Sequence, residues 1–480
     1  MMNVRYSRIT LFLWALFSLY FEKKVALSLS TSNSRRPAKR IAIIGSGIGG
    51  LSVAHALTNS PTLQDQYGGY KDFEVSMFEA RPKLDIKAGA GVQLNGGLVA
   101  LGKINTNVQR AVINAGLPLS SIRSRSKLWS NNNNDDNSKK PFEDLLRIDL
   151  KKIGDMSNQL IQGDGELLWS AIMRGCLQET LWKTLPLATQ RRVKFNKVLA
   201  NMYPQAQDGG IICEFSDGTT AGPFDVVLGC DGVNSACKEY IETGQISKDP
   251  VHRQGRAAPL YSGIRIKYAV DDSWIPKNDS TKSEAALTQY FGDGANVLVG
   301  AYGNGMGRPN SKIAFYVSLD EDYTGPFRKK QATEKSTNKA DENANWREEE
   351  RRYRDFAQRA ITAGIQEHGI PSGEVDPIVK AADRFFEVGV YFHNPFSLAG
   401  WSKKLPGKDS AVVALCGDAA VSYSCRSFSS VFDRIEWKAN TAQTKICMNI
   451  TAHNPSLFGT GVKPSHSGCI LFSPQTVRIQ

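Results

Sequence analysis

The chain has 480 residues and a net charge of +12, and 41% of its residues are hydrophobic. Such a length can bury a large core and predicts two domains or one large two-part body. The basic residues are scattered and are not interleaved with aromatic side chains, which argues against a nucleic-acid-binding protein. Eight cysteines without C-x-x-C pairs and six isolated histidines argue against a zinc site or a disulfide scaffold, and no metal is predicted.

The first 38 residues indicate a targeting segment. Leu11 to Phe21 is an apolar block that is short for a membrane span but suits the core of a signal peptide. Lys23 to Arg40 is serine-rich and basic and contains no acid, a composition typical of transit segments. Together they resemble a bipartite plastid leader and favour import into a plastid. A secreted protein and an uncleaved membrane anchor are the alternatives.

A glycine motif follows at the start of the folded part. Residues 41–44 are an apolar, β-branched run that predicts a buried strand, and apolar residues return at helical spacing in 51–57. Between them Gly45, Gly47 and Gly50 form G-x-G-x-x-G, which permits a sharp turn, close approach of backbone to a pyrophosphate, and close helix–strand packing. The following helix N-terminus favours phosphate. The motif predicts a dinucleotide site, with an ordinary tight turn as the alternative.

An acidic residue closes the next predicted strand. Residues 73–78 predict the strand, and Glu79 stands at its carboxyl end, where a carboxylate can bind ribose hydroxyls. The separation from Gly50 exceeds the usual spacing of about 20 residues, and we assign the excess to a surface insertion over Pro61–Lys71. A solvated carboxylate is the alternative for Glu79.

The middle of the chain predicts a mixture of helices and strands. Residues 88–97 are glycine-rich, which suggests backbone close to a ligand or a flexible loop, and a helix through Ile104 follows. Residues 131–140 predict an exposed loop. Residues 163–181 predict a loop that enters a helix, with Arg174 in its first turn.

Later segments alternate in the manner of β-strands. Residues 192–220 predict a strand meander with an Asp-Gly turn, and a buried strand then leads to Asp231-Gly232. Antiparallel strands are predicted at 260–268, 287–291, 296–302 and 313–319. Residues 328–345 predict a loose polar segment and 346–365 an amphipathic helix. A last buried strand leads to Gly417-Asp418.

Three elements now stand in order: the glycine motif with Glu79, Asp231-Gly232, and Gly417-Asp418. This set resembles the FAD-dependent aromatic hydroxylase-like monooxygenases, which include para-hydroxybenzoate hydroxylase, kynurenine monooxygenase and zeaxanthin epoxidase, over about residues 39–420. The resemblance implies an α/β fold in which a Rossmann-like FAD-binding domain with a parallel sheet is joined to a mostly antiparallel β-sheet substrate domain. The implied division is 39–110, 165–245 and 406–420 for the FAD-binding domain, 111–164 and 246–405 for the substrate domain, and 421–480 for an atypical tail.

The resemblance also implies a set of site residues. FAD would be bound tightly and NAD(P)H would be a transient co-substrate. The cofactor-binding residues would be Gly45, Gly47, Gly50, Glu79, Arg81, Gly91, Gln93, Arg174, Asp231, Gly232, Gly417 and Asp418, with Asn95 also bordering the flavin. Arg174 would face the phosphates or the ribityl chain, Asp231 the region shared with the nicotinamide donor, and Asp418 the ribityl hydroxyls. No acid–base pair is nominated, because the cofactor carries the difficult chemistry.

The aromatic residues Tyr290, Tyr391 and Trp401 are candidates for the substrate wall, with plain core packing as the alternative. The implied activity is a monooxygenase that uses NAD(P)H and O2 to hydroxylate or epoxidise a small aromatic or isoprenoid substrate through a flavin hydroperoxide. The leader favours a carotenoid-epoxidase-like role. A flavin-dependent reductase of the geranylgeranyl type and a degenerate, non-catalytic FAD-binding protein are the alternatives. Peripheral association with a membrane is left open.

The chain departs from the family pattern at two places. Lys238 stands where the family usually has arginine after Asp-Gly. Residues 421–430 replace the family's His, Pro and Gly-x-Gly helix start, and nothing further on restores it. We hypothesise that the tail from about residue 421 is divergent or misassembled, and a transcript that encodes this same tail would refute misassembly.

Overall fold

The computed structural model describes most of the chain after residue 38. The described residues are 39–61, 73–85, 87, 89–94, 96–127, 142–150, 152, 169–205, 209–247, 258–274, 286–320, 339–393, 400–405, 411–420, 446–447 and 471–472, with backbone only for 339–350, 446–447 and 471–472. The targeting segment, most of the Pro61–Lys71 insertion, the loop at 131–140 and almost all of the tail after Ala420 lie outside the described residues.

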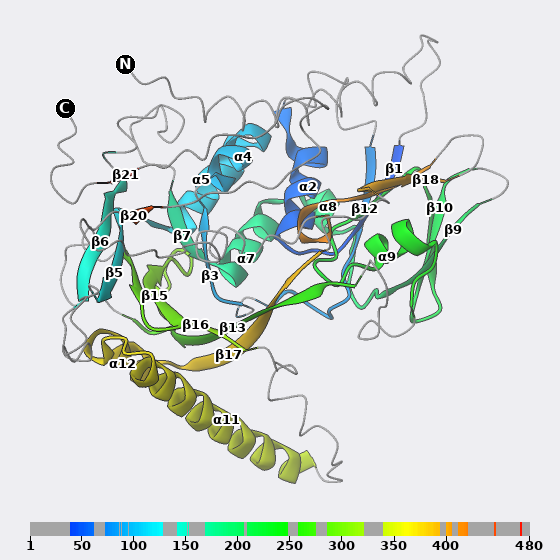
Figure 1. The fold of residues 1–480 in the computed structure, drawn as a ribbon. Helices are drawn as coiled ribbons and strands as arrows, with labels where there is room; N and C mark the ends of the chain where they lie inside the picture. Colours follow the sequence, from blue (N-terminus) through cyan, green and yellow to red (C-terminus); the bar gives the residue numbers. More distant parts are fainter. Residues whose placement is uncertain are drawn as a thin grey trace, which may run out of the picture. The chain divides into compact units, whose positions relative to one another are not determined.

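A six-stranded sheet carries the glycine motif at the end of its strand β1 (Figure 1). Its order is β18 (Ser402–Lys404), β19 (Val412–Leu415), β12 (Val226–Gly229), β1 (Lys39–Ile44), β2 (Phe73–Phe78) and β8 (Val193–Lys194). All neighbours are parallel except β18 and β19. Because parallel strands end at one edge, Gly45, Glu79, Asp231 and Gly417 all lie just beyond the same edge of this sheet, the usual place for a ligand in such folds.

The sheet is buried on both faces. Ile41 and Ile43 pack into the cluster that contains α2 (Ile48–Asn59) and α7 (Arg174–Thr184), whereas Ala42 and Ile44 pack into the cluster of the opposite face. The elements of that opposite face are the antiparallel strands β11 (Thr220–Phe224), β10 (Ile211–Phe215) and β9 (Leu199–Pro204), together with α9 (Ala236–Thr243). A strand covered on both faces needs an apolar side chain at every position, which accounts for the run at 41–44.

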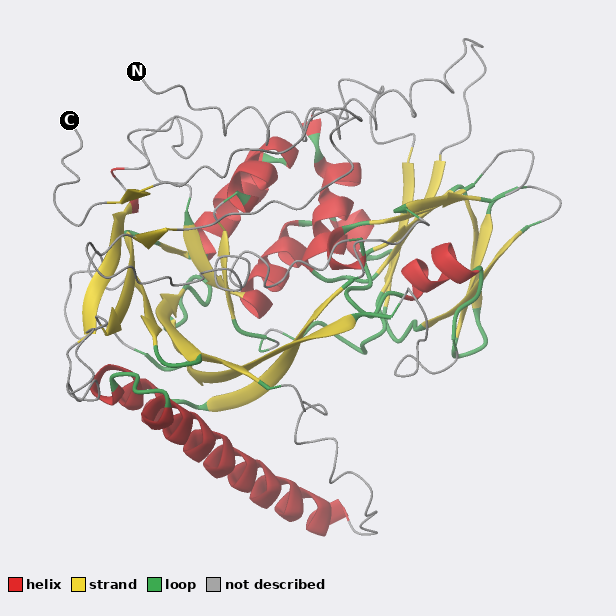
Figure 2. Ribbon diagram, viewed as in Figure 1, coloured by secondary structure: helices red, strands yellow, loops and turns green. Residues whose placement is uncertain are grey.

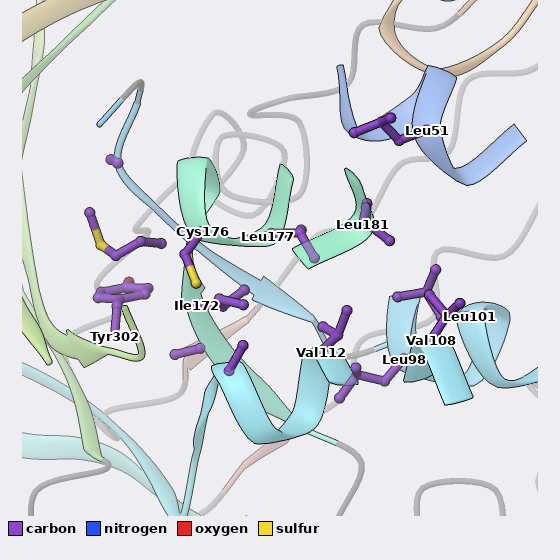
Figure 3. Packing of buried hydrophobic residues seen from close by; sticks show 14 of the residues in the cluster. Leu51, Leu98, Leu101, Val108, Val112, Ile172, Cys176, Leu177, Leu181 and Tyr302 are labelled. Atoms are coloured by element: carbon purple, nitrogen blue, oxygen red, sulfur yellow. The ribbon is translucent and has the colours of Figure 1, made fainter. Parts of the chain in front are cut away.

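A group of short elements completes the first face. It consists of α4 (Gly97–Ile104), α5 (Thr106–Ala115), α8 (Leu187–Gln190) and a small sheet in the order β3 (Gly91–Leu94), β7 (Ser170–Met173), β4 (Leu117–Pro118). Figure 3 shows apolar side chains of α4, α5 and α7 lying among one another. Asn105 separates α4 from α5 and caps the second helix, because its side chain accepts hydrogen bonds from the backbone N–H groups of Asn107 and Val108.

The seven-stranded sheet forms the second large unit of structure. Its order is β17 (Arg384–Phe392), β13 (Leu260–Asp271), β16 (Ser311–Leu319), β15 (Ala295–Tyr302), β14 (Ala286–Phe291), β5 (Ser121–Lys127) and β6 (Phe142–Asp149). All of its pairings are antiparallel except that of β14 with β5. One face contributes Ile266, Leu287 and Ile313 to the cluster shared with α2 and α7. The other face packs against α11 (Lys339–Glu367) and α12 (Ser372–Ala381), drawn as red helices beside the yellow strands in Figure 2.

The structure corrects three expectations about these elements. Ser170–Met173 is a strand, although residues 163–181 predicted a loop that enters a helix; the helix begins only at Arg174. Helix α11 begins at Lys339, inside the segment 328–345 that predicted loose structure. The strand β18 lies within 246–405, which the sequence assigned to the substrate domain, but it pairs with β19 in the parallel sheet. For Ser170–Met173 and for β18, pairing with a distant strand decides the structure.

The chain is therefore of the α/β class, with mixed sheets and flanking helices. In the tail, the two-residue strands β20 (Ile446–Cys447) and β21 (Leu471–Phe472) pair antiparallel with each other. Among the described residues, no helix combines the length and the apolar character that a bilayer crossing requires.

Candidate functional site

The glycine motif forms a tight turn between β1 and α2. Gly45 has a φ of +100°, and a Cβ atom there would lie 2.5 Å from the carbonyl oxygen of Cys230. A Cβ atom on Gly50 would lie 1.9 Å from the carbonyl oxygen of Gly45. Both positions therefore exclude a side chain through contacts with the protein itself.

Gly47 differs from its two neighbours in the motif. A Cβ atom built on Gly47 meets no heavy atom within 4 Å. Gly47 is also the N-cap of α2, and as a glycine it has no side chain with which to cap that helix end. The first N–H groups of an uncapped helix need a partner, and the helix dipole favours an anion there. The open space at Gly47 thus adjoins a group of donors that suits phosphate.

Polar side chains from two other elements hold the turn in place. The Glu79 carboxylate accepts hydrogen bonds from the Ser46 backbone N–H at 2.8 Å and from the Ser46 hydroxyl at 2.6 Å. The Gln178 amide on α7 donates to the Ser46 carbonyl oxygen at 2.8 Å. Ser46 is fully buried, so these bonds replace the water that its polar groups lose. No sequence signal marks Ser46 or Gln178 for this role; Gln178 lies one helical turn after Arg174, at the spacing that places side chains on one face.

The segment that follows β19, at the same edge of the parallel sheet as the glycine motif, lies directly against α2. Gly417 has a φ of +64°, and a Cβ atom there would lie 3.8 Å from the Cα atom of Gly49. Burial raises the pKa of the adjacent Asp418 carboxyl, and the positive charge of Arg174 opposes that rise. Burial lowers the pKa of Arg174, the nearby Arg81 lowers it further, and Asp418 opposes both. The structure therefore brings together three predicted residues from separate segments: Arg81, Arg174 and Asp418.

Neither Arg174 nor Asp418 uses its side chain for an ion pair within the described part of the chain. A guanidinium offers five N–H donors, and a carboxylate offers two acceptor oxygens. Unused capacity of this kind, at the edge where ligands bind in open α/β sheets, is available to a polar ligand.

Asp231 has a role in the structure that its motif did not indicate. Its carboxylate accepts hydrogen bonds from the Ser235 hydroxyl at 2.5 Å, the Ala236 N–H at 2.7 Å and the Cys237 N–H at 3.2 Å. These donors lie at the start of α9, so Asp231 fixes that helix end. Burial raises the pKa of Asp231, and the three donors oppose the rise. Gly232, at φ +81°, makes the turn between strand and helix, and the predicted contact of Asp231 with the nicotinamide donor stays a prediction.

Gly91 and Gln93 lie against a tyrosine of the seven-stranded sheet. A Cβ atom on Gly91 would lie 2.2 Å from the ring of Tyr302, so glycine is needed here to admit that ring. The Gln93 side chain forms a hydrogen bond with Tyr302, which is 1% exposed. Gly89, at φ +80°, faces the side chain of Arg174. Their predicted contact with the flavin is untested, and Asn95 lies outside the described residues.

Tyr290 is not placed as a pocket wall. It is 2% exposed and belongs to the cluster between the seven-stranded sheet and helices α11 and α12. Its hydroxyl donates to the Glu374 carboxylate, and the Arg125 guanidinium lies 5.7 Å from its ring centroid. Because side chains alternate across a strand, Tyr290 projects to the opposite face from Leu287, which packs toward α2 and α7. The expectation is corrected: Tyr290 is a packing residue of the outer face.

The other two aromatic candidates lie apart from it. Tyr391, on β17, has its ring centroid 5.4 Å from that of Tyr261. Trp401 is 53% exposed, and its carbonyl oxygen accepts a hydrogen bond from the Leu415 N–H. These three aromatic residues therefore do not form one wall.

A buried histidine lies close to Asp418 and was not predicted. His393 follows β17 and is 8% exposed. Burial and then the charge of Lys238 lower the pKa of His393 to about 4, while the Asp418 backbone opposes this. Lys238 is 3% exposed and lies 3.6 Å from the Glu242 carboxylate. No sequence signal marks His393, because it comes from the end of a strand of the other sheet. Among the described residues, no group of three or more His, Cys, Asp or Glu could hold a metal ion.

Known proteins of similar sequence can now be compared with this site. The chain is 24% identical to a salicylate hydroxylase of Pseudomonas putida over 302 residues, which cover 62% of this chain and 58% of that protein. It is 25% identical over 288 residues to the FAD-dependent monooxygenase pigN of Monascus ruber, covering 59% of this chain and 56% of the relative. The chain thus spans little more than half the length of these relatives. No protein-family model matches it.

Solved structures show the same fold. A variant of HpxO from Klebsiella pneumoniae, complexed with FAD, superposes with a TM-score of 0.50 at 19% identity, covering 80% of this chain and 75% of that one. The 2,6-dihydroxypyridine-3-hydroxylase of Arthrobacter nicotinovorans gives a TM-score of 0.51 at 16% identity, covering 81% and 79%.

The resemblance to FAD-dependent hydroxylases is confirmed. One of these relatives is named as FAD-dependent and one of the solved structures holds FAD, in agreement with the predicted cofactor. The residues at the edge of the parallel sheet fit such a cofactor. The open space at Gly47 suits a pyrophosphate, and Arg174 and Asp418, which form no ion pair among the described residues, can bond polar groups of the cofactor.

Proposed function

We propose that the chain binds FAD along the carboxyl edge of the parallel sheet and uses it, with NAD(P)H and O2, to oxygenate a small aromatic substrate. One observation carries the proposal. The N-terminus of α2 lies at one edge with the Arg174 and Asp418 side chains, which form no ion pair among the described residues, next to a turn that side chains from two other elements hold in shape. This arrangement leaves donors and acceptors unused where a dinucleotide would need them.

Each residue has a definite role in this proposal. The N–H groups that follow Gly47 bind the pyrophosphate, and Glu79 accepts bonds from the ribose through the capacity that remains after its bonds to Ser46 and to the Arg81 N–H. Asp418 accepts from the ribityl hydroxyls, and Arg174 donates to the same chain or to phosphate. Burial raises the pKa of Asp418, and Arg174 favours its ionised, acceptor form.

The bound flavin supplies the redox chemistry with O2, and the protein supplies position and a surrounding of fixed dipoles. The substrate class is proposed from the names of two relatives, the salicylate hydroxylase and the 3-amino-4-hydroxybenzoate 2-monooxygenase of Streptomyces cremeus, the latter 25% identical over 262 residues. An isoprenoid substrate and import into a plastid are the second proposal, which the composition of the first 38 residues supports.

The test uses the purified full-length chain. We expect a yellow protein whose visible spectrum shows bound flavin. Added NADPH or NADH should be oxidised faster when an aromatic acid such as salicylate is present, with matching O2 uptake and a product that carries one more oxygen atom. A chain that stays colourless after incubation with FAD would overturn the proposal.

Two other outcomes would identify the alternative functions. Saturation of a prenyl double bond without substrate-dependent O2 uptake would indicate a reductase of the geranylgeranyl type. A yellow protein that oxidises neither NADPH nor NADH with any substrate would indicate a non-catalytic flavin-binding protein. The sequence that follows Ala420 favours this second outcome, because it lacks the family's pattern there.

A further inference from the structure

Two cysteines follow neighbouring strands of the parallel sheet. Cys230 comes directly after β12 and Cys416 directly after β19. Gly229 is paired in register with Leu415, and the Cys416 N–H donates to the Gly229 carbonyl oxygen at 2.9 Å. The next residue of each strand therefore lies beside its counterpart, and both side chains point to the same face of the sheet. Consistent with this, both cysteines pack against one core cluster.

The two thiols lie close enough to interact. Interaction with Cys230 lowers the pKa of Cys416, and interaction with Cys416, together with burial, raises the pKa of Cys230. Cys416 is half-buried, whereas Cys230 is 9% exposed. Cys416 is therefore the better nucleophile of the pair, because the thiolate is the reactive form and Cys416 is also the more accessible.

The backbone spacing suits a disulfide. Adjacent strands lie about 4.8 Å apart, which falls within the Cα separation of about 4.4–6.8 Å that disulfides span. A third cysteine, Cys237, belongs to the cluster on the opposite face of the sheet. A Cβ atom on Gly229 would lie 2.4 Å from the Cys237 Cβ atom, which places Cys237 beneath the strand rather than beside Cys416.

We propose that Cys230 and Cys416 form a reversible disulfide on exposure to hydrogen peroxide. The Cys416 thiolate attacks a peroxide oxygen, the O–O bond breaks, and a sulfenic acid forms with release of the first water after proton transfer. Cys230 then attacks the Cys416 sulfur, the S–O bond breaks, and a second water leaves as the S–S bond forms. Two thiols are oxidised, one peroxide is reduced to two waters, and a low-molecular-weight dithiol reverses the change by exchange.

The disulfide between Cys230 and Cys416 would restrict the backbone of the glycine turn. The Cys230 carbonyl oxygen is the atom that a Cβ atom on Gly45 would meet, and the Cys230 Cβ atom would lie 3.4 Å from one on Gly50. Cys416 directly precedes Gly417-Asp418. A bond between the two sulfurs links the ends of both strands and limits the backbone adjustment available to the turn. On the proposed function, on which this consequence rests, oxidation lowers the affinity for FAD several-fold.

The linkage is tested by mass spectrometry on the full-length chain. The reduced protein is treated with hydrogen peroxide, its free thiols are alkylated, and it is digested without reductant. We expect a peptide pair joined through Cys230 and Cys416 that disappears on reduction. It should be absent from C230A and C416A but retained in C213A, since Cys213 lies fully buried in β10 and burial raises its pKa to about 12. Recovery of Cys416 as sulfinic acid without a link, or a link through Cys237, would overturn the proposal.

Measuring how well the protein retains FAD distinguishes formation of the disulfide from its proposed effect on the glycine turn. We expect peroxide-treated wild type to retain FAD less well than the reduced form, and C416A to be insensitive to the treatment. Unchanged retention in a protein that contains the bridge would overturn the coupling to the turn. A chain that binds no FAD in either state would contradict the proposed function, whereas the peptide assay would still decide whether the disulfide forms.

Discussion

The two sheets of this protein use their polar groups in opposite ways. At the edge of the parallel sheet, Gly47 faces open space and the Arg174 and Asp418 side chains have no ion-pair partner among the described residues. On the outer face of the seven-stranded sheet, Arg125 pairs with both Asp144 and Glu374, and Tyr290 donates to Glu374. The charged side chains Arg174 and Asp418 of the first region form no ion pair among the described residues, whereas those of the second region pair with one another.

This difference teaches how a ligand site can be told from a structural network. Arg174 and Asp418 form no ion pair among the described residues, so their donors and acceptors can serve a ligand. In the network of Arg125, Glu374 and Tyr290 the charged groups bond within the protein and contribute to folding. The same distinction moves Tyr290 out of the substrate pocket and keeps Asp418 at the cofactor.

The largest expected effect, which tests the comparison between the two sheets, comes from substitution of a glycine in the turn between β1 and α2. Gly50→Ala places a Cβ atom 1.9 Å from a backbone oxygen, and we expect a loss of roughly 3 kcal/mol or more in unfolding free energy because backbone must shift. Gly47→Ala is the matched control: its Cβ atom meets open space, so stability should change by less than about 0.5 kcal/mol while FAD binding is lost. Urea denaturation and the flavin spectrum measure the two effects. Equal destabilisation by both substitutions would contradict the assignment of Gly47 to the ligand.

The second test concerns His393, which joins the two regions because it follows a strand of one sheet and lies near Asp418 of the other. Its pKa is lowered to about 4, from 6.5 in the unfolded chain, chiefly by burial and then by Lys238. Between these values the unfolded state binds a proton that the folded state does not, so stability rises with pH across this window. The gain is about 3 kcal/mol at most, is complete above pH 6.5, and is lost as the pH falls toward 4.

The measurement is the unfolding free energy of wild type and His393→Gln at several pH values from 4 to 7. We expect the slope in this window to be clearly smaller in the variant. A slope that is the same in both proteins would show that another group titrates there.

The third test compares two aspartates, one from each region. Asp418→Asn should lower FAD affinity about tenfold, or about 1.4 kcal/mol, by removing a charged acceptor, and should leave stability nearly unchanged. Asp144→Asn, on the edge strand β6, weakens ion pairs with Arg123 and Arg125 and should leave FAD affinity unchanged. Flavin fluorescence titration distinguishes the two variants. A reversed pattern would mean that the ligand site has been assigned to the wrong sheet.

The smallest expected effect tests the corrected role of Tyr290. Tyr290→Phe removes one hydrogen bond to Glu374 and should lower stability by about 1 kcal/mol, with no change in FAD affinity or in KM for an aromatic substrate. Chemical denaturation and steady-state kinetics measure these quantities. An increase in KM with unchanged stability would instead indicate that Tyr290 contacts the substrate.

The sequence by itself predicted the local elements of the parallel sheet. Three local patterns were enough to predict structure: the apolar run at 41–44, the glycine triplet and the acid at Glu79. Backbone turns and two-sided burial restrict which residues can stand at such positions. The ordered Asp231-Gly232 and Gly417-Asp418 pairs added the family resemblance and hence the fold class.

Only the tertiary structure decided which groups meet and which are already satisfied. Gln178 reaches Ser46 across 132 positions of the chain, and Asp231 proves to fix a helix end. Tyr290 faces the outer helices, and Cys416 lies beside Cys230 because two strands far apart in the chain are paired. A sequence shows which side chains are able to bond, but whether a bond remains free for a ligand depends on the neighbours that folding brings to it.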